Sequence, residues 1–175
     1  MNLQVVYCTH HSADLSLRER LAFSDEDKVR AYGRLRERFP NSEFVVLSTC
    51  NRVELYTAQE SPDHAPTHQQ LADFFADFHS IPLDEFFDDL LERTGPDAVR
   101  HLFSVASGVD SMVVGEPQIV SQVREAYATA RLNSASGPLA NAMFERALKV
   151  GKRIRTETGL AEGRISIASV AVGDF

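Results

Sequence analysis

Short apolar runs rich in β-branched residues mark three expected strands in the first third of the chain. Such runs, bounded by polar or turn-forming residues, are typical of buried strands. They are LQVVYCT at 3–9, EFVVLST at 43–49 and VELYTA at 53–58. In two further segments apolar residues recur every three or four positions, at 24–39, which Pro40 ends, and at 67–79. This spacing predicts amphipathic helices that pack on the strands.

The residues that follow the second helix decide the fold class. Residues 84–93 fit either a strand or a helix, and we expect an edge strand that closes the sheet. Ser16 and Glu19 have the spacing of a capping box, which marks the start of a helix. The order is then strand, helix, strand, strand, helix, strand, which is the split βαβ arrangement of ferredoxin-like domains. The sequence therefore predicts an α+β fold with a ferredoxin-like sheet.

From Gly95 onward the pattern is helical. Apolar spacing predicts helices over 97–106, 117–133 and 138–157. Pro117 suits the first position of its helix, where a backbone N–H would have no partner. Residues 165–175 resemble the opening of a further element. We therefore expect a helical region appended to the sheet.

Composition indicates a folded protein without a membrane span. Of the residues 43% are apolar and 25% charged, which argues against a disordered or fibrous chain. No run approaches the ~18 apolar residues of a transmembrane helix, and the N-terminus lacks the features of a secretory signal. The two cysteines, Cys8 and Cys50, cannot form a disulfide framework and indicate reduced thiols. We expect a cytoplasmic location.

Charge is distributed unevenly along the chain. A formal net charge of −7 argues at first against a nucleic-acid partner. However, residues 60–97 hold ten acidic residues and one basic residue, whereas residues 144–164 hold six basic residues and three acidic ones. The basic segment weakens the objection, although a solvated helix face is its simpler explanation.

The run LSTCNRVELY at 47–56 is the strongest candidate for chemistry. It places Cys50 where a buried strand ends, beside the hydrogen-bonding side chains of Thr49 and Asn51. Arg52 supplies a planar cation that can hold a carboxylate through two hydrogen bonds. Since positive charge favours the reactive thiolate, these residues suit a nucleophilic cysteine. The alternative is a buried core thiol with an arginine in a surface ion pair.

A second run, GVDSMVVGEPQIVSQV at 108–123, turns the N-terminal end of a helix toward a glycine-containing loop. Gln118 and Gln122 share one face of that helix, although an ordinary capped helix explains them equally. His101 lies on a largely apolar helix, where a satisfied core histidine is the usual case. The sequence holds no dinucleotide fingerprint and no P-loop. Cys8 and His10 lack the further ligands that a metal site needs.

STCNRVELY and GVDSMVVGEPQIVSQVREAY closely resemble the N-terminal catalytic domain of glutamyl-tRNA reductases. GKRIRTETGLAEGRISIASVAV, at 151–172, resembles the stretch that leads into the long "spinal" helix of that family. The family reduces glutamate esterified to its tRNA to glutamate-1-semialdehyde, the first step of tetrapyrrole synthesis by the five-carbon route. Similarity runs through nearly the whole chain and is weakest over residues 60–94.

The resemblance implies that Cys50 is the nucleophile, which attacks the aminoacyl ester, releases the tRNA and leaves a glutamyl thioester. Arg52 would hold a substrate carboxylate in a pocket lined by Thr49 and Asn51. His101 matches a histidine needed for activity, which would assist proton transfer to the departing ribose oxygen. The remaining positions that match substrate contacts are Ser111, Glu116, Pro117, Gln118 and Gln122. Glu116 would pair with the free α-ammonium group.

The resemblance also implies a domain organisation. Residues 1–158 would form the catalytic, substrate-binding domain, and residues 159–175 would begin the linker. The NADPH-binding and dimerisation domains would lie outside this chain, so NADPH has no binding residues here. The implied partners are glutamyl-tRNA(Glu), a second copy in a homodimer, and glutamate-1-semialdehyde aminomutase. We expect the chain to form the thioester without reducing it.

Two other interpretations remain. The chain could be a non-catalytic module of the same ancestry that binds RNA or a partner through residues 146–155, with Cys50 inert. Faster alkylation of Cys50 than of Cys8 would argue against that module. A stand-alone cysteine hydrolase lacks an identified pair of histidine and acid beside the cysteine.

Overall fold

The computed structural model of the chain describes residues 2–111 and 116–158. The element expected at 165–175 lies outside the described residues. In chain order the helices and strands are β1 (Asn2–Thr9), α1 (Leu15–Leu21), α2 (Asp25–Arg38), β2 (Glu43–Ser48), β3 (Arg52–Gln59), α3 (His68–His79), β4 (Leu91–Thr94), α4 (Gly95–Ser107), α5 (Pro117–Leu132) and α6 (Pro138–Glu157).

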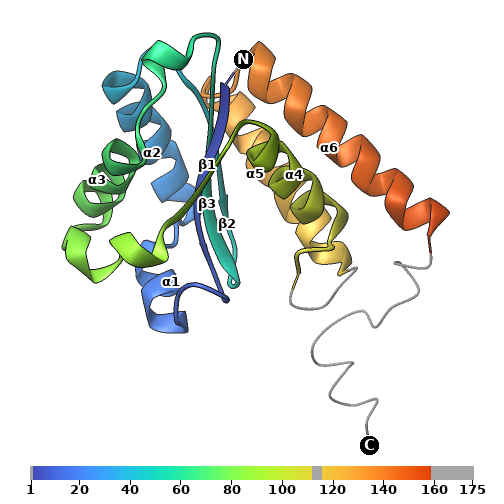
Figure 1. The fold of residues 1–175 in the computed structure, drawn as a ribbon, viewed down its shortest axis with the longest axis horizontal. Coiled ribbons are helices and arrows are strands. Elements are labelled where there is room, and N and C mark those ends of the chain that lie inside the picture. The colour runs from blue at the N-terminus through green and yellow to red at the C-terminus, as the bar shows by residue number, and fades with distance from the viewer. Residues whose placement is uncertain (1, 112–115, 159–175) are drawn as a thin grey trace, which may run out of the picture.

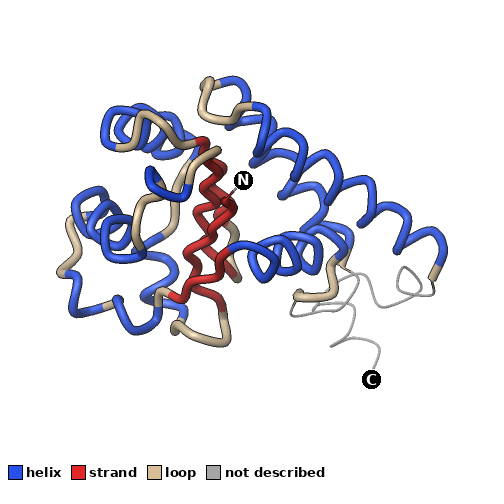
Figure 2. The backbone as a smooth tube through the Cα atoms, turned by 45° about the horizontal axis from the view of Figure 1, so that its top comes forward, coloured by secondary structure: helices blue, strands red, loops and turns tan. Residues whose placement is uncertain are grey.

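One antiparallel sheet, in the strand order β2-β3-β1-β4, divides the molecule into two helical groups. Helices α1, α2 and α3 cover one face, and helices α4, α5 and α6 cover the other (Figure 1). Figure 2 shows the sheet nearly edge-on between the two groups. The expected mixture of a sheet with packed and appended helices is therefore confirmed.

One local prediction was right only in part, and another was wrong. Of the expected edge strand at 84–93, only the last part pairs with β1, and short 3-10 turns at Leu83–Glu85 and Phe87–Asp89 precede it. Phe86 and Leu90 are buried four residues apart, so the helical component of this ambiguous pattern prevails there. The helix expected from Ser16 is capped instead by Asp14, whose carboxylate accepts from the N–H of Leu17 at 2.7 Å.

The capping box lies at the next helix, where Ser24 and Asp27 bond to each other's backbone N–H. Ser16 lies inside α1 because Asp14, an equally good cap, stands two residues earlier.

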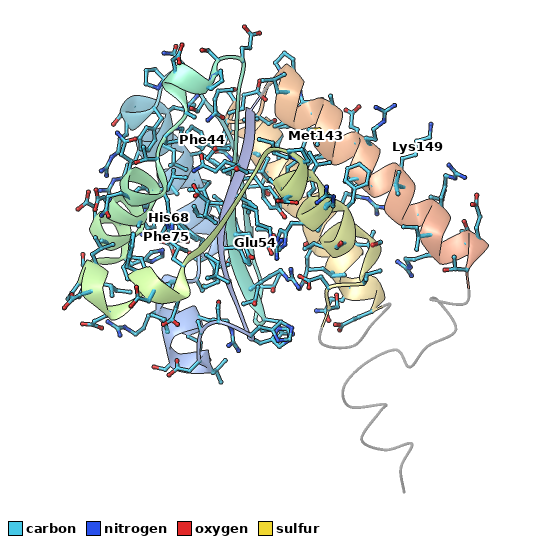
Figure 3. The ribbon with its side chains drawn as sticks, viewed as in Figure 1. Phe44, Glu54, His68, Phe75, Met143 and Lys149 are labelled. Carbon is cyan, nitrogen blue, oxygen red and sulfur yellow. The ribbon has the colours of Figure 1, made fainter. Side chains whose placement is uncertain are left out.

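The two faces of β3 differ in chemistry because successive side chains point to opposite sides. Tyr56 packs edge-on against Phe144 of α6, with ring centroids 5.2 Å apart. Arg52 and Glu54 point to that same side, whereas Val53 and Leu55 face α1, α2 and α3. Figure 3 shows Glu54 on the α4 side of the sheet and Phe75 on the α3 side.

Helix α6 is fixed to the rest of the molecule near both of its ends. At its start, the Glu43 carboxylate of β2 accepts N–H groups from Gly137 at 3.0 Å, Leu139 at 3.2 Å and Ala140 at 2.6 Å. These are N–H groups that a helix leaves without internal partners. Near its end, Gly151 lies so close to α4 that an added Cβ would collide with the carbonyl of Ala106. The helix is therefore held to the sheet and to α4.

Candidate functional site

Cys50 occupies the tight turn between β2 and β3 and is exposed. Thr49 closes this turn: its N–H donates to the Arg52 carbonyl at 2.8 Å. Its hydroxyl oxygen accepts from the N–H groups of Asn51 and Arg52, both at 3.2 Å. Thr49 therefore shapes the backbone that presents the cysteine.

Neighbouring segments hold the main chain of this turn from behind. The His10 N–H donates to the Asn51 carbonyl at 3.1 Å. The guanidinium of Arg18 donates to the Cys50 carbonyl at 3.4 Å and to the Ala13 carbonyl at 2.5 Å. Arg18 is only 7% exposed, so its charge is held under the cysteine. Nothing in the helical pattern of α1 distinguishes Arg18 from a surface arginine, so its contact with the cysteine turn was not predicted.

Arg52 is buried, with 2% of its side chain exposed. Its Nη1 donates to Glu54 at 2.8 Å and to the Asp110 carboxylate at 3.1 Å, and its Nη2 donates to the Asp110 carbonyl. Burial alone would lower the pKa of this guanidinium, but the charges of Glu54 and Asp110 outweigh burial and raise the pKa. Arg52 therefore ties the loop after α4 to the cysteine turn.

This arrangement is the opposite of the alternative in which the thiol of Cys50 is buried and Arg52 forms an ion pair at the surface. The cysteine is at the surface and the arginine is inside.

Glu54 is the fully buried acceptor that the surrounding donors share. Its carboxylate accepts from Arg52, from the Tyr56 hydroxyl at 2.6 Å, and pairs with His101 Nε2 at 2.9 Å. Burial raises the pKa of Glu54, but hydrogen bonds and charge from His101, together with Arg52, lower it to about 2. The carboxylate therefore stays ionised. Arg52, Glu54 and Tyr56 alternate along β3, and this run of polar groups on one face of an expected buried strand was the missed signal.

His101 reaches this group from α4 and is itself buried. Its ring lies 4.5 Å from that of Tyr7, which stands opposite Glu54 in the sheet. The pair with Glu54 satisfies Nε2 and orients the ring. The usual case of a satisfied core histidine fits this geometry, and a catalytic role stays a prediction.

The second run contributes one side chain, that of Asp110, which contacts Arg52 beside the cysteine turn. Gly108 ends α4 in the left-handed conformation, at φ 77°, and the chain then turns back toward β3. Asp110 binds Arg52, and Ser111 follows it with its hydroxyl buried and without a partner in the described part of the chain. Such an unpaired polar atom indicates space for a ligand group or water.

The remaining candidate residues of that run lie at the start of α5. Glu116 is half-buried at the start of α5, which begins at Pro117, whereas Gln118 is exposed and Gln122 half-buried. Across residues 2–111 and 116–158, no hydrogen bond or ion pair links Glu116, Gln118 or Gln122 to Cys50 or its neighbours. Their roles as substrate contacts stay predictions.

Other candidates carry no site. Cys8 is buried in β1, and burial raises the pKa of its thiol to about 11. Among the described residues, no group of His, Cys, Asp or Glu could hold a metal ion. In the same part of the chain, no helix is both long enough and apolar enough to span a membrane.

Comparisons with known proteins agree with the two sequence runs. The family described as "Glutamyl-tRNAGlu reductase, N-terminal domain" matches residues 6–158. The glutamyl-tRNA reductase of Rhodopirellula baltica is 40% identical over 99% of this chain and 41% of its own length. That of Marinobacter nauticus is 41% identical over 98% of this chain and 39% of its own length.

A solved structure shares the fold as well. The glutamyl-tRNA reductase from Methanopyrus kandleri matches with a TM-score of 0.78 and 38% identity. This match covers 98% of this chain and 38% of that one. The chain thus spans about two fifths of the length of these relatives.

Proposed function

The chain belongs to the family of glutamyl-tRNA reductase N-terminal domains, and from this premise we propose that it recognises glutamyl-tRNA(Glu) and forms the covalent glutamyl intermediate. Cys50 Sγ attacks the ester carbon, the bond to the ribose oxygen breaks, and a proton goes to that oxygen as the tRNA leaves. A glutamyl thioester remains on Cys50. Covalent catalysis of this kind divides one difficult step into two easier ones.

The observation that carries this proposal is the exposed Cys50 on a turn whose backbone is fixed by Thr49, His10 and Arg18. Because the backbone of the turn is fixed, the position of the Cys50 side chain is restricted while its sulfur stays accessible. The adjacent Arg52 is oriented by Glu54, so the anion-binding group is also preorganised.

Arg52 can accept a substrate carboxylate by exchange with Asp110. The Asp110 side chain is 38% exposed, whereas Glu54 is fully buried. We infer that the substrate carboxylate takes the place of Asp110 while Glu54 keeps the guanidinium oriented. Asn51 and Ser111 lie on the two segments that Arg52 joins, and would line the same pocket.

His101, held by Glu54, would deliver the proton to the ribose oxygen. Glu116 would pair with the α-ammonium group. Pro117, Gln118 and Gln122 would complete the substrate contacts from α5.

We propose that NADPH binds outside the described residues, among which no glycine-rich turn links a strand to a helix. In the complete reductase, NADPH would supply the hydride that turns the thioester into glutamate-1-semialdehyde, the first step of tetrapyrrole synthesis. We propose that another domain binds it, and we derive no hydride step on this chain. The thioester formed here should therefore hydrolyse slowly.

Mass spectrometry tests the proposal directly. The chain incubated with glutamyl-tRNA(Glu) should carry a glutamyl adduct on Cys50, and uncharged tRNA should give none. Cys50→Ser should abolish the adduct, whereas the matched variant Cys8→Ser should keep it. Iodoacetamide should label Cys50 and leave Cys8 unlabelled in the folded chain, because Cys8 is buried.

An adduct that persists in Cys50→Ser would refute the assignment. Equal alkylation rates for the two cysteines would favour the non-catalytic module.

The proposal extends to the organisation of the whole protein. The strand order β2-β3-β1-β4 supports a ferredoxin-like arrangement of the sheet. We propose residues 1–158 as the catalytic domain and 159–175 as the start of the linker to the further domains. A cytoplasmic homodimer that passes its product to glutamate-1-semialdehyde aminomutase is the corresponding assembly.

A further inference from the structure

A groove of about 350 Å³ between α5 and α6 is lined by basic side chains. Its walls are Val120, Arg124, Lys152, Arg155 and Thr156. Three of these five residues carry a positive charge and none carries a negative one. In a chain with a net charge of −7, such a site concentrates charge of one sign in one place.

These three cations lack partners within the described residues. Arg124, Lys152 and Arg155 form no ion pair there, whereas Arg153 on the same helix pairs twice with Glu157, at 3.1 and 3.2 Å. In addition, the Nε of Arg155 is buried without a hydrogen-bond acceptor in that part of the chain. A buried donor without an acceptor costs free energy, which an anion in the groove would recover.

The groove lies at the end of the molecule that carries the cysteine turn. Figure 1 shows α4 ending and α5 beginning toward the same lower end of the sheet where β2 turns into β3. Helix α5 begins shortly after Ser111, and its first two turns bear Val120 and Arg124. Gln118 and Gln122 lie on the other side of that helix. A ligand that reaches both the groove and the cysteine must therefore be extended.

The acidic segment 60–97 disfavours such a ligand. The acidic residues of 60–97 belong to α3, β4, the start of α4 and the turns between them. A polyanion is therefore favoured at the basic groove over this acidic segment.

On the basis of the proposed function, we propose that this groove binds backbone phosphates of the acceptor arm of the tRNA. Phosphates repeated along a strand match several cations set along a groove, and the fork of an arginine holds a phosphate through two hydrogen bonds. These contacts position the RNA without reading its sequence.

Fluorescence anisotropy with a labelled, uncharged tRNA(Glu) transcript tests the groove separately from the cysteine chemistry. The double variant Arg124→Glu with Lys152→Glu changes two exposed side chains, so it should fold as the wild type does. Its affinity should fall about tenfold or more, and the slope of log K against log salt should decrease by about 2. Adding Arg155→Glu should weaken binding further. The matched control Arg36→Glu, an exposed arginine on α2, should bind as the wild type does.

Unchanged affinity and salt slope in the double variant would overturn the proposal, as would an equal loss in Arg36→Glu. Weaker retention on heparin with unchanged RNA binding would show a general anion patch and would also overturn it. Cys50→Ser should bind the transcript like the wild type. If the wild type binds through the groove but forms no adduct, the proposed chemistry fails and the groove stands.

Discussion

The two sides of the sheet bury different kinds of side chain. Toward α1, α2 and α3 the interior is aromatic, with the Phe23 and Phe75 ring centroids 5.5 Å apart and those of Phe23 and Phe78 5.1 Å apart. Toward α4, α5 and α6 it holds the charged group of Arg52 and Glu54 with His101. The first side gains its stability from non-directional burial, which tolerates small shifts. The second depends on directional contacts, and it is the side on which we propose the chemistry takes place.

Replacing Glu54 should give the largest difference in behaviour between the two sides of the sheet. Glu54→Ala leaves Arg52 buried without its inner partner, which should cost about 3–5 kcal/mol of unfolding free energy. Phe75→Ala on the other side should cost a similar amount, about 3–5 kcal/mol, through the cavity it leaves. Only the first should lower the yield of Cys50 adduct per folded molecule. Urea unfolding and mass spectrometry measure the two quantities.

A double variant sharpens this result. Arg52→Met with Glu54→Leu removes the buried charge pair and should recover part of the stability but no adduct, because the Tyr56 hydroxyl and His101 Nε2 still lose their acceptor. Full adduct formation in the double variant would show that the charged group serves stability alone.

Replacing each of two glycines by alanine should change the free energy of unfolding in opposite directions. Gly151→Ala forces a methyl group against the Ala106 carbonyl of α4 and should cost about 1–3 kcal/mol. Gly33, in α2, has open space around its added Cβ, so Gly33→Ala should stabilise by about 0.5–1 kcal/mol through helix propensity. Thermal unfolding compares them. A stabilising Gly151→Ala would contradict the close approach of α4 and α6.

Lowering the pH should reduce the stability of the fold through a different group on each side of the sheet, and each group acts in its own pH range. The expected loss is smaller than that caused by the substitutions above. Burial against Phe23 and Phe75 lowers the pKa of His79 from 6.5 to about 4. The unfolded chain therefore binds this proton first, and stability falls as the pH drops from 6.5 toward 4. Glu54, whose pKa is lowered from 4.5 to about 2, stabilises the fold above pH 4.5 and loses this effect as the pH falls further.

Urea unfolding at several pH values checks this order. His79→Phe should flatten the loss of stability between pH 6.5 and 4.5. If the variant loses as much stability in that range as the wild type, His79 is not the group that titrates.

Helices could be predicted from the sequence wherever a single spacing of apolar residues dominated the segment. Helices at 24–39, 67–79, 97–106, 117–133 and 138–157 agree with the structure to within two residues at each end. The edge strand expected at 84–93 was right only for its last part, because Phe86 and Leu90 satisfy a helical spacing in a segment too short to decide.

The site was predictable only in part, for a physical reason. Cys50 and Arg52 stand out as residue types beside a strand, so local sequence was sufficient to find them. Arg18 and Asp110 approach from α1 and from the loop after α4, and those contacts exist only in the folded chain. Burial of Arg52 also depends on α4 covering the sheet, which no local pattern contains.

The attachment of α6 by Glu43 helps to determine how far the basic groove lies from the cysteine turn. Glu43 lies at the start of β2, and the cysteine turn lies at the other end of that strand. A helix of 20 residues extends about 30 Å from its first turn. The Glu43 carboxylate fixes the position of the first turn of this helix, and the contact of Gly151 with α4 fixes its position near the other end. Glu43 and Gly151 together therefore fix where Lys152 and Arg155 stand relative to Cys50, although neither of them belongs to the groove or to the cysteine turn.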